Sequence, residues 1–254
     1  MINILDSCII LLGGFAAGAV NAIAGGGTLI SFPILTAIGI PIVSANVTST
    51  VSLSPGYLAA TFAQIKDLKG QKNRLLLFFP IAALGGIIGG LLLLHTGDKL
   101  FRSLVPYLIL LASCLLALQE PLKKWLNNRK KQEVQFHQIS IWVLLAITVA
   151  AIYGGYFGAG LSVIVLAVLA LTINDNITRL NALKQFIGFG VNISTAIFFI
   201  FSDKVVWPAV IFMATGAIIG GWAGGKFAGK IKPVTLRYIV VVIGFAVSII
   251  YFVK

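Results

Sequence analysis

The sequence alternates between long apolar runs and short stretches that carry charges, glycines or prolines. A helix that spans the hydrocarbon core of a bilayer needs roughly 20 apolar residues, and most of these runs approach that length. The pattern therefore predicts a series of membrane helices joined by short connections. The predicted segments are residues 4–24, 28–39, 43–65, 75–95, 101–118, 139–157, 161–172, 179–201, 205–225 and 234–253.

Two of these segments are too short to span a membrane. As helices, 28–39 and 161–172 would rise only about 18 Å, against a hydrocarbon core of about 30 Å. Each follows a glycine-rich stretch, Gly-Gly-Gly at 25–27 and Gly-Ala-Gly at 158–160. We interpret them as half-helices that enter the membrane after an unwound break.

The spacing of the two breaks indicates an internal duplication. Gly27 and Gly160 are 133 positions apart, and the run Ile-Ile-Gly-Gly at 87–90 recurs 131 positions later at 218–221. Each half then follows one plan: a helix, a glycine break, a half-helix and three full spans. Duplications with broken helices in corresponding positions are typical of secondary transporters, in which the breaks form the binding site.

The predicted fold is all-α, a polytopic transmembrane helical bundle made of two inverted repeats. Each repeat contains one glycine-broken helix-loop-helix element followed by three spanning helices. The first repeat covers residues 1–120, a basic cytoplasmic linker covers 121–138, and the second repeat covers 139–254.

The inversion follows from the positions of the basic residues, which favour the cytoplasmic side. If each broken element enters and leaves on one side, 15 of the 19 Lys and Arg residues share that side. They come from 66–74, 123–131 and 226–237, together with Arg179 and Lys184. If each broken element crossed once, the split would be 11 to 8. We therefore predict both termini outside and the 121–137 loop in the cytoplasm.

Composition supports an integral membrane protein. Hydrophobic residues make up 59% of the chain and charged residues 10%, whereas soluble domains carry about 25% charged residues. The net charge of +12 sits in clusters between apolar runs, so we expect lipid anchoring and no nucleic-acid partner. The two cysteines lie in apolar stretches and indicate neither a disulfide framework nor a metal site, and we predict no cofactor. No basic residue precedes the apolar run at 9–20, so we expect it to remain in the mature protein.

Acidic residues avoid the predicted spans. All seven lie at helix ends or in loops: Asp6, Asp67, Asp98, Glu120, Glu133, Asp175 and Asp203. A sodium- or proton-coupled carrier that relies on a buried carboxylate is therefore disfavoured.

One cation falls well inside a span, on a polar stripe. Residues at relative positions 0, 3, 4, 7 and 11 share one helical face, and here they are Asn181, Lys184, Gln185, Gly188 and Asn192. Lys184 could supply a fixed positive charge to a buried anion, because an ammonium in an apolar bundle is costly. The alternative is that Lys184 extends to the cytoplasmic headgroups.

Hydroxyl groups and backbone N–H groups complete the predicted site. Thr48, Ser49 and Ser52 share one face and could donate to substrate oxygens or simply pack between helices. The first residues of a half-helix present N–H groups at the positive end of the helix dipole, which suits an anion such as a sulfonate, sulfite or carboxylate. The predicted substrate-binding residues are Asn21, Gly26, Gly27, Thr28, Thr48, Ser49, Ser52, Gly158, Gly160, Ser162, Asn181, Lys184, Gln185 and Asn192.

At these residues the chain resembles the sulfite exporter TauE/SafE family of membrane transporters. The resemblance covers nearly the whole chain and rests on GGFAAGAVNAIAGGGTLISFPIL at 13–35, ANVTSTVSL at 45–53, GGYFGAG at 154–160 and the repeated IIGG. It implies a permease of the bacterial cytoplasmic membrane that moves sulfite or sulfur-containing organic anions outward. The second half departs from the family pattern, because 161–169 lacks the proline and Asn181-Ala182 replaces the Thr-Ser pair.

The leading hypothesis is therefore a secondary transporter that exports a small anion by alternating access. An anion channel is the close alternative, and a non-transporting scaffold is a third. An enzyme is disfavoured because no paired carboxylates, His/Cys metal set or Ser/His arrangement faces a common site. The expected partners are a small anion and the lipid bilayer, and the chain could also form a homodimer.

Overall fold

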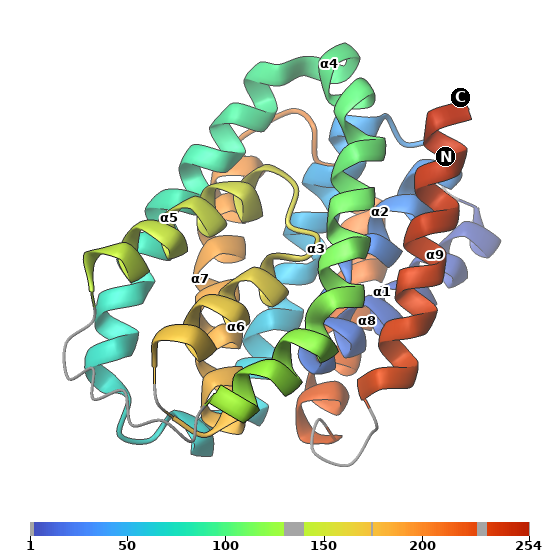
Figure 1. The fold of residues 1–254 in the computed structure, drawn as a ribbon. Coiled ribbons are helices and arrows are strands. Elements are labelled where there is room, and N and C mark those ends of the chain that lie inside the picture. Colours follow the sequence, from blue (N-terminus) through green and yellow to red (C-terminus); the bar gives the residue numbers. More distant parts are fainter. Residues whose placement is uncertain (1–2, 130–139, 174, 228–232, 254) are drawn as a thin grey trace.

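The computed structural model describes residues 3–129, 140–173, 175–227 and 233–253, and these residues form helices without a single strand (Figure 1). Within them, five helices are long and apolar enough to cross a membrane, and three shorter apolar helices accompany them. The prediction of an all-α, multi-span bundle is confirmed. The elements are α1 (Ile4–Ile23), α2 (Thr28–Ala37), α3 (Ile42–Ala63), the 3-10 helix η1 (Ile65–Leu68), α4 (Lys72–Arg129), α5 (Ile141–Tyr156), α6 (Leu161–Thr172), α7 (Ile177–Ile200), α8 (Trp207–Phe227) and α9 (Pro233–Val253).

The predicted segments agree with these helices except at the end of α4. The label α4 covers two helices, which correspond to the segments 75–95 and 101–118 and meet at a kink at Gly97, whose φ of 71° and ψ of 166° are not helical. Glycine adopts this conformation without a Cβ clash, so the chain can turn back sharply at that point. The second of these helices continues through Arg129, into the stretch that was expected to be a linker. Basic residues show where side chains leave the hydrocarbon core, but a helix can continue beyond that point. The rest of the predicted linker, 130–138, lies outside the described residues.

The repeated Ile-Ile-Gly-Gly runs lie where helices touch backbone to backbone. A Cβ at Gly89 of α4 would overlap the carbonyl oxygen of Ile152 in α5. A Cβ at Gly220 of α8 would overlap the carbonyl oxygen of Phe15 in α1. Small residues permit such close approach between membrane helices, where no hydrophobic effect drives association. The same motif thus serves the same packing role in both halves of the chain.

The bundle exposes apolar side chains on its outer surface and buries a polar face of α3 within a largely apolar interior. Helix α9 exposes large apolar side chains such as Val242 and Ile249, whereas α3 buries most of its hydroxyl and amide side chains. Polar groups inside a membrane bundle are costly unless they face one another or a substrate path. The buried polar face of α3 packs against α7, and this contact marks the interior where a site is expected.

Polar contacts join neighbouring inter-helix connections at each end of the bundle. At the lower end of Figure 1, the start of α4 is joined to the α6–α7 connection through Arg74 and Asp175. At the other end, Asp98 accepts a hydrogen bond from the backbone N–H of Val43 at the start of α3. The predicted orientation likewise places Arg74 and Arg179 on one side, and both contact Asp175. The side of the membrane on which each end lies stays a prediction.

Candidate functional site

The two glycine breaks fold in the same way after α1 and after α5. Gly25 and Gly26 have φ values of 82° and 94°, and Gly158 and Gly160 have values of 81° and 79°. These left-handed conformations strain any residue that carries a Cβ. The breaks are therefore fixed locally by glycine, and each leads directly into a half-helix, α2 or α6.

The breaks lie against each other in the interior, although they are more than a hundred residues apart in sequence. A Cβ placed on Gly25 would lie 2.5 Å from Cβ of Ser162, in the first turn of α6. A Cβ placed on Gly158 would lie 3.5 Å from Oγ1 of Thr28, in the first turn of α2. Each break thus contacts the beginning of the half-helix from the other half of the chain. The structure brings together the two motifs that the sequence singled out.

Not all of the N–H groups expected to be open at the breaks are open. The N–H of Gly27 donates to Oδ1 of Asn21 over 2.6 Å, and the N–H of Gly158 donates to the carbonyl of Tyr153 over 3.4 Å. By contrast, the described residues provide no hydrogen-bond acceptor for the N–H groups of Gly26, Thr28, Gly160 and Ser162. The open N–H groups therefore come from both breaks, but from fewer positions than the sequence indicated.

Gln185 of α7 closes the end of α1. Its Nε2 donates to the carbonyl of Asn21 over 3.0 Å and to the carbonyl of Ala22 over 2.8 Å. The last carbonyls of a helix have no intrahelical partner, and inside a membrane protein they must be satisfied by another group. Gln185 supplies that group, so it holds the first break against α7. Its Oε1 is buried and accepts no hydrogen bond from the described residues.

The polar stripe of α7 faces the first half of the chain. Nδ2 of Asn181 donates to Oε1 of Gln64, directly after α3, over 2.8 Å. Gly188 lies under the ring of Tyr57, where a Cβ would come within 2.9 Å of the ring. Nδ2 of Asn192 donates to the carbonyl of Gly188 over 2.9 Å. The stripe therefore forms a wall between α3 and the end of α1.

Lys184 belongs to this stripe and is only 1% exposed. An ammonium that reaches the lipid headgroups needs an exposed side chain, so this burial argues against that alternative. A charge enclosed in a low-dielectric interior acts more strongly on its surroundings than one in water. Lys184 thus lies buried in the wall that contacts the first break through its neighbour Gln185.

The predicted hydroxyl residues of α3 do not all gather at the breaks. Ser49 shares a hydrogen bond of 2.6 Å with Ser31 of α2, so it lies against a half-helix. Thr48 instead accepts a hydrogen bond from the N–H of Val206, just before α8, and Ser52 donates to the carbonyl of Thr48. For Thr48 and Ser52 these contacts favour the helix-packing alternative.

Tyr57 of α3 was not among the predicted residues. It is 3% exposed, and its hydroxyl lies near the side chains of Ser162 and Asn192. The available signal was periodicity, because Tyr57 follows Ser54 by three positions on the same helical face. Its contacts with α6 and α7 depend on the tertiary structure.

The second part of α4 covers both breaks with apolar side chains. A Cβ on Gly26 would lie 2.5 Å from Cδ1 of Leu116, and a Cβ on Gly160 would lie 3.3 Å from Cα of Ala112. This cover excludes water from the breaks, which strengthens electrostatic interactions in the site.

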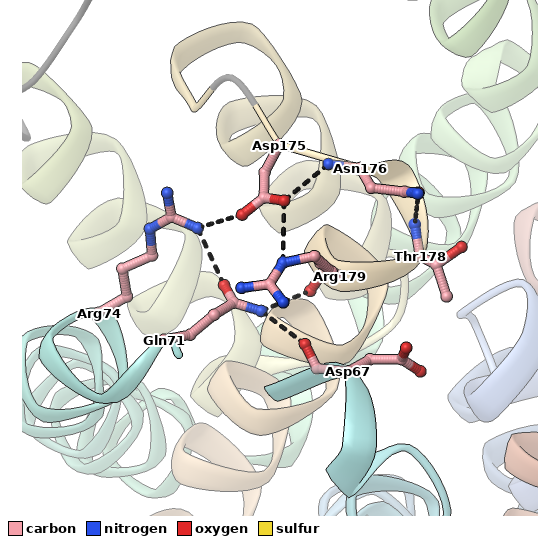
Figure 2. A network of polar contacts seen from close by, with 7 residues as sticks. All are labelled: Asp67, Gln71, Arg74, Asp175, Asn176, Thr178 and Arg179. Atoms are coloured by element: carbon pink, nitrogen blue, oxygen red, sulfur yellow. Dashed lines mark hydrogen bonds and ion pairs between the residues drawn. The ribbon is translucent and has the colours of Figure 1, made fainter. Parts of the chain in front are cut away.

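A network of polar contacts closes the lower end of the bundle, and Figure 2 shows Asp175 between two guanidinium groups. Oδ2 of Asp175 lies 2.5 Å from Nη1 of Arg74, and Oδ1 lies 2.9 Å from Nε of Arg179. Gln71 adds two contacts: Nε2 donates to the carbonyl of Arg179 over 3.3 Å, and Oε1 accepts from Arg74 over 3.1 Å. The beginning of α4 is thereby joined to the beginning of α7.

The titration of Asp175 reflects this network. Burial by itself would raise the pKa of the carboxyl. Hydrogen bonds from Arg74, from the backbone N–H of Asn176 and from Arg179, together with the charge of Arg179, outweigh burial and lower the pKa of Asp175 below its ordinary value of 3.8. Asp175 is therefore ionised at neutral pH, and both pairs are charged.

The opposite end holds a cavity and a cluster of rings. The cavity has a volume of about 410 Å³, and its lining includes Thr36, Arg102 and Tyr251. The ring of Tyr251 stacks on Phe32 at 6.0 Å, and Phe32 meets the edge of Phe157 at 5.7 Å. Phe157 directly precedes the second break, so buried rings separate the cavity from the breaks.

The arrangement suits binding better than bond chemistry. It combines open N–H groups, hydroxyls, amides and one buried cation, which are donors to an anion. Among the described residues no group of three His, Cys, Asp or Glu side chains could hold a metal ion.

Comparisons with known proteins find one matching family model and relatives named as membrane transporters. The family model described as sulfite exporter TauE/SafE matches residues 10–251. A probable membrane transporter protein of Haemophilus influenzae is 26% identical over 235 residues, covering 92% of this chain and 90% of the relative. The probable membrane transporter protein YfcA of Escherichia coli K12 is 25% identical over 237 residues, covering 91% of this chain and 84% of the relative. No solved structure matches the chain.

Proposed function

The chain belongs to the sulfite exporter TauE/SafE family of membrane transporters, and we propose that it exports a small anion across a bacterial cytoplasmic membrane. The proposed cargo is sulfite, a sulfonate or another small organic acid. Sulfite is proposed because the family is described as sulfite exporters. Sulfonates and other small organic acids are proposed because the hydrogen-bond donors at the breaks suit any small oxyanion.

The proposal rests on the contact between the two glycine breaks and on the buried Lys184 beside them. Gly25 and Ser162 touch, Thr28 lies next to Gly158, and open N–H groups of both half-helices lie in the first turns. Helix N-termini attract anions through their N–H groups and dipole. Lys184 adds a full positive charge to the adjoining wall, which raises the affinity for any anion enclosed there.

Alternating access between inverted halves is the proposed mechanism. This mechanism is supported by the equivalent packing of two glycines: Gly89 packs against the backbone of α5, and Gly220 packs against the backbone of α1. A duplicated, inverted unit would produce such equivalent contacts. The proposed units are residues 1–120 and 139–254. One would rock against the other around the breaks, opening first one end and then the other.

A carrier fits the two ends better than a channel does. The network around Asp175 joins α4 to α7 at one end, and Phe32 and Phe157 lie between the breaks and the cavity at the other. A channel needs a continuous path when open, whereas a carrier passes through states in which a closed gate covers the site.

The test is transport by purified protein in proteoliposomes. Labelled sulfite, sulfoacetate, taurine and carboxylates would be offered in uptake and counterflow. A carrier shows stimulation by substrate on the opposite side, and a channel does not. Absence of specific flux for every anion, with protein shown to be folded, would leave the scaffold alternative.

The role of Lys184 is tested in the same assay. Lys184→Met keeps the apolar stem and removes the charge, so the apparent affinity should fall by about an order of magnitude or more, since hydrogen bonds to charged groups contribute about 1.5–3 kcal/mol. Lys184→Arg should retain part of the affinity. Lys66→Met removes an exposed cation from η1 and serves as the control. Near-normal affinity in folded Lys184→Met would contradict the role.

A further inference from the structure

Tyr57 lies in the interior where α3, α6 and α7 come together. Its ring covers Gly188, and a Cβ at that position would come within 2.9 Å of the ring. The side chain is 3% exposed, so its hydroxyl cannot rely on solvent for hydrogen bonds. The phenol is therefore held rigidly, with its hydroxyl directed into the protein.

Uncharged side chains lie beside this hydroxyl. They are Ser162 and Asn192, from the second half of the chain. Oγ of Ser162 is buried, and no hydrogen bond of full geometry reaches it within the described part of the chain. Ser162 also touches Gly25, so this hydroxyl lies at the contact between the two breaks.

A buried hydroxyl with an unmet hydrogen bond destabilises the fold and is rare in native structures. Such groups are found where a ligand or water completes the bonding. Ser162 and Tyr57 each carry a rotatable O–H, so both can turn toward an acceptor that enters between them. The contact between the breaks offers that place, because the open N–H groups of both half-helices are there.

We propose that Tyr57 is a substrate-binding residue that, together with Ser162, donates hydrogen bonds to the oxygens of an oxyanion held at the glycine breaks. This inference rests on the proposed function. Two hydroxyls on different helices call for a ligand with at least two acceptor oxygens on one centre. Sulfite, a sulfonate and a carboxylate meet that requirement, and the breaks supply the remaining donors.

The first test is Tyr57→Phe, which keeps the ring over Gly188 and removes only the hydroxyl. Sulfite counterflow in proteoliposomes should show KM raised about tenfold or more, with the maximal rate nearly unchanged, because a hydrogen bond to a charged ligand is lost. Tyr107→Phe provides the matched control, since Tyr107 is 62% exposed on α4. A purely structural Tyr57 would lower the yield of folded protein or the maximal rate, and leave KM unchanged.

Ser162→Ala gives a second test, in which thermostability and substrate affinity should respond differently. Removing a buried hydroxyl that lacks a full bond should leave the unliganded protein equally or more thermostable, while KM for sulfite rises. If the wild-type protein transports sulfite and KM is unchanged in both Tyr57→Phe and Ser162→Ala, the proposed role of Tyr57 is wrong and the proposed function stands. If folded wild-type protein moves no anion, the proposed function itself fails and this inference fails with it.

Discussion

The network around Asp175 is predicted to act as a latch that holds the lower end of the transporter closed. Asp175→Asn preserves the shape of the side chain and removes its charge, leaving Arg74 and Arg179 near each other without the carboxylate between them. Each charge-assisted hydrogen bond contributes about 1.5–3 kcal/mol when buried. The side chains are 15% exposed for Asp175 and 28% for Arg74, so solvent screening reduces this contribution.

We expect the substitution to weaken the closed lower end by about 1–2 kcal/mol in total. That corresponds to a roughly 5- to 30-fold larger population open at this end. The reporter is Thr61→Cys in a background where Cys8 and Cys114 are replaced by alanine. Thr61 is buried on α3, on the same helical face as Tyr57, and should become accessible only when the lower end opens.

The assay is the labelling rate of this cysteine by a membrane-impermeant thiol reagent in inside-out vesicles. Asp175→Asn should raise the rate about 5- to 30-fold. Asp67→Asn is the matched control, because it removes the same charge nearby while Asp67 contributes only its backbone carbonyl to the network. An equal rate in Asp175→Asn and the parent protein would refute the latch.

The pH dependence has a defined sign. The pKa of Asp175 is lowered in the folded protein, so its stabilising contribution is fully present above the ordinary, unfolded value of 3.8 and is lost as pH falls through the lower folded value. Labelling of the reporter should therefore be insensitive to pH between about 5 and 8. A steep change within that range would assign the latch to another group.

Two further predictions follow from orientation and packing. A single cysteine at Lys204 should react with an impermeant reagent in intact cells, whereas one at Lys66 should react only after permeabilisation; the reverse result would invert the predicted topology. Gly220→Val should nearly abolish folded protein, as judged by detergent-extracted monodisperse yield, because its Cβ would overlap the Phe15 carbonyl. Gly39→Ala, with open space around its Cβ but a φ of 89°, should cost only modest stability, and equal losses would contradict the packing argument.

Several features of the fold could be predicted from sequence because their causes are local. The length of an apolar run decides whether a helix can cross a hydrocarbon core of about 30 Å, and this comparison identified α2 and α6 as short helices. Glycine clusters showed where helices break, because other residues avoid left-handed conformations. The 3.6-residue period identified the stripe on α7 as one face. The break between the predicted spans 75–95 and 101–118 falls at Gly97, as expected, whereas the short length of α5, 16 residues, was not predicted.

The composition of the site was decided by tertiary structure, because hydrogen bonds between helices depend on which faces pack together. Sequence could not show that Asn21 binds the N–H of Gly27, or that Thr48 holds the start of α8. Nor could it place Tyr57 beside Ser162, since α3 and α6 are joined only through the packed interior. Helix formation follows from the order of residues along the chain, whereas the donors available to an anion follow from how the two halves close around the breaks.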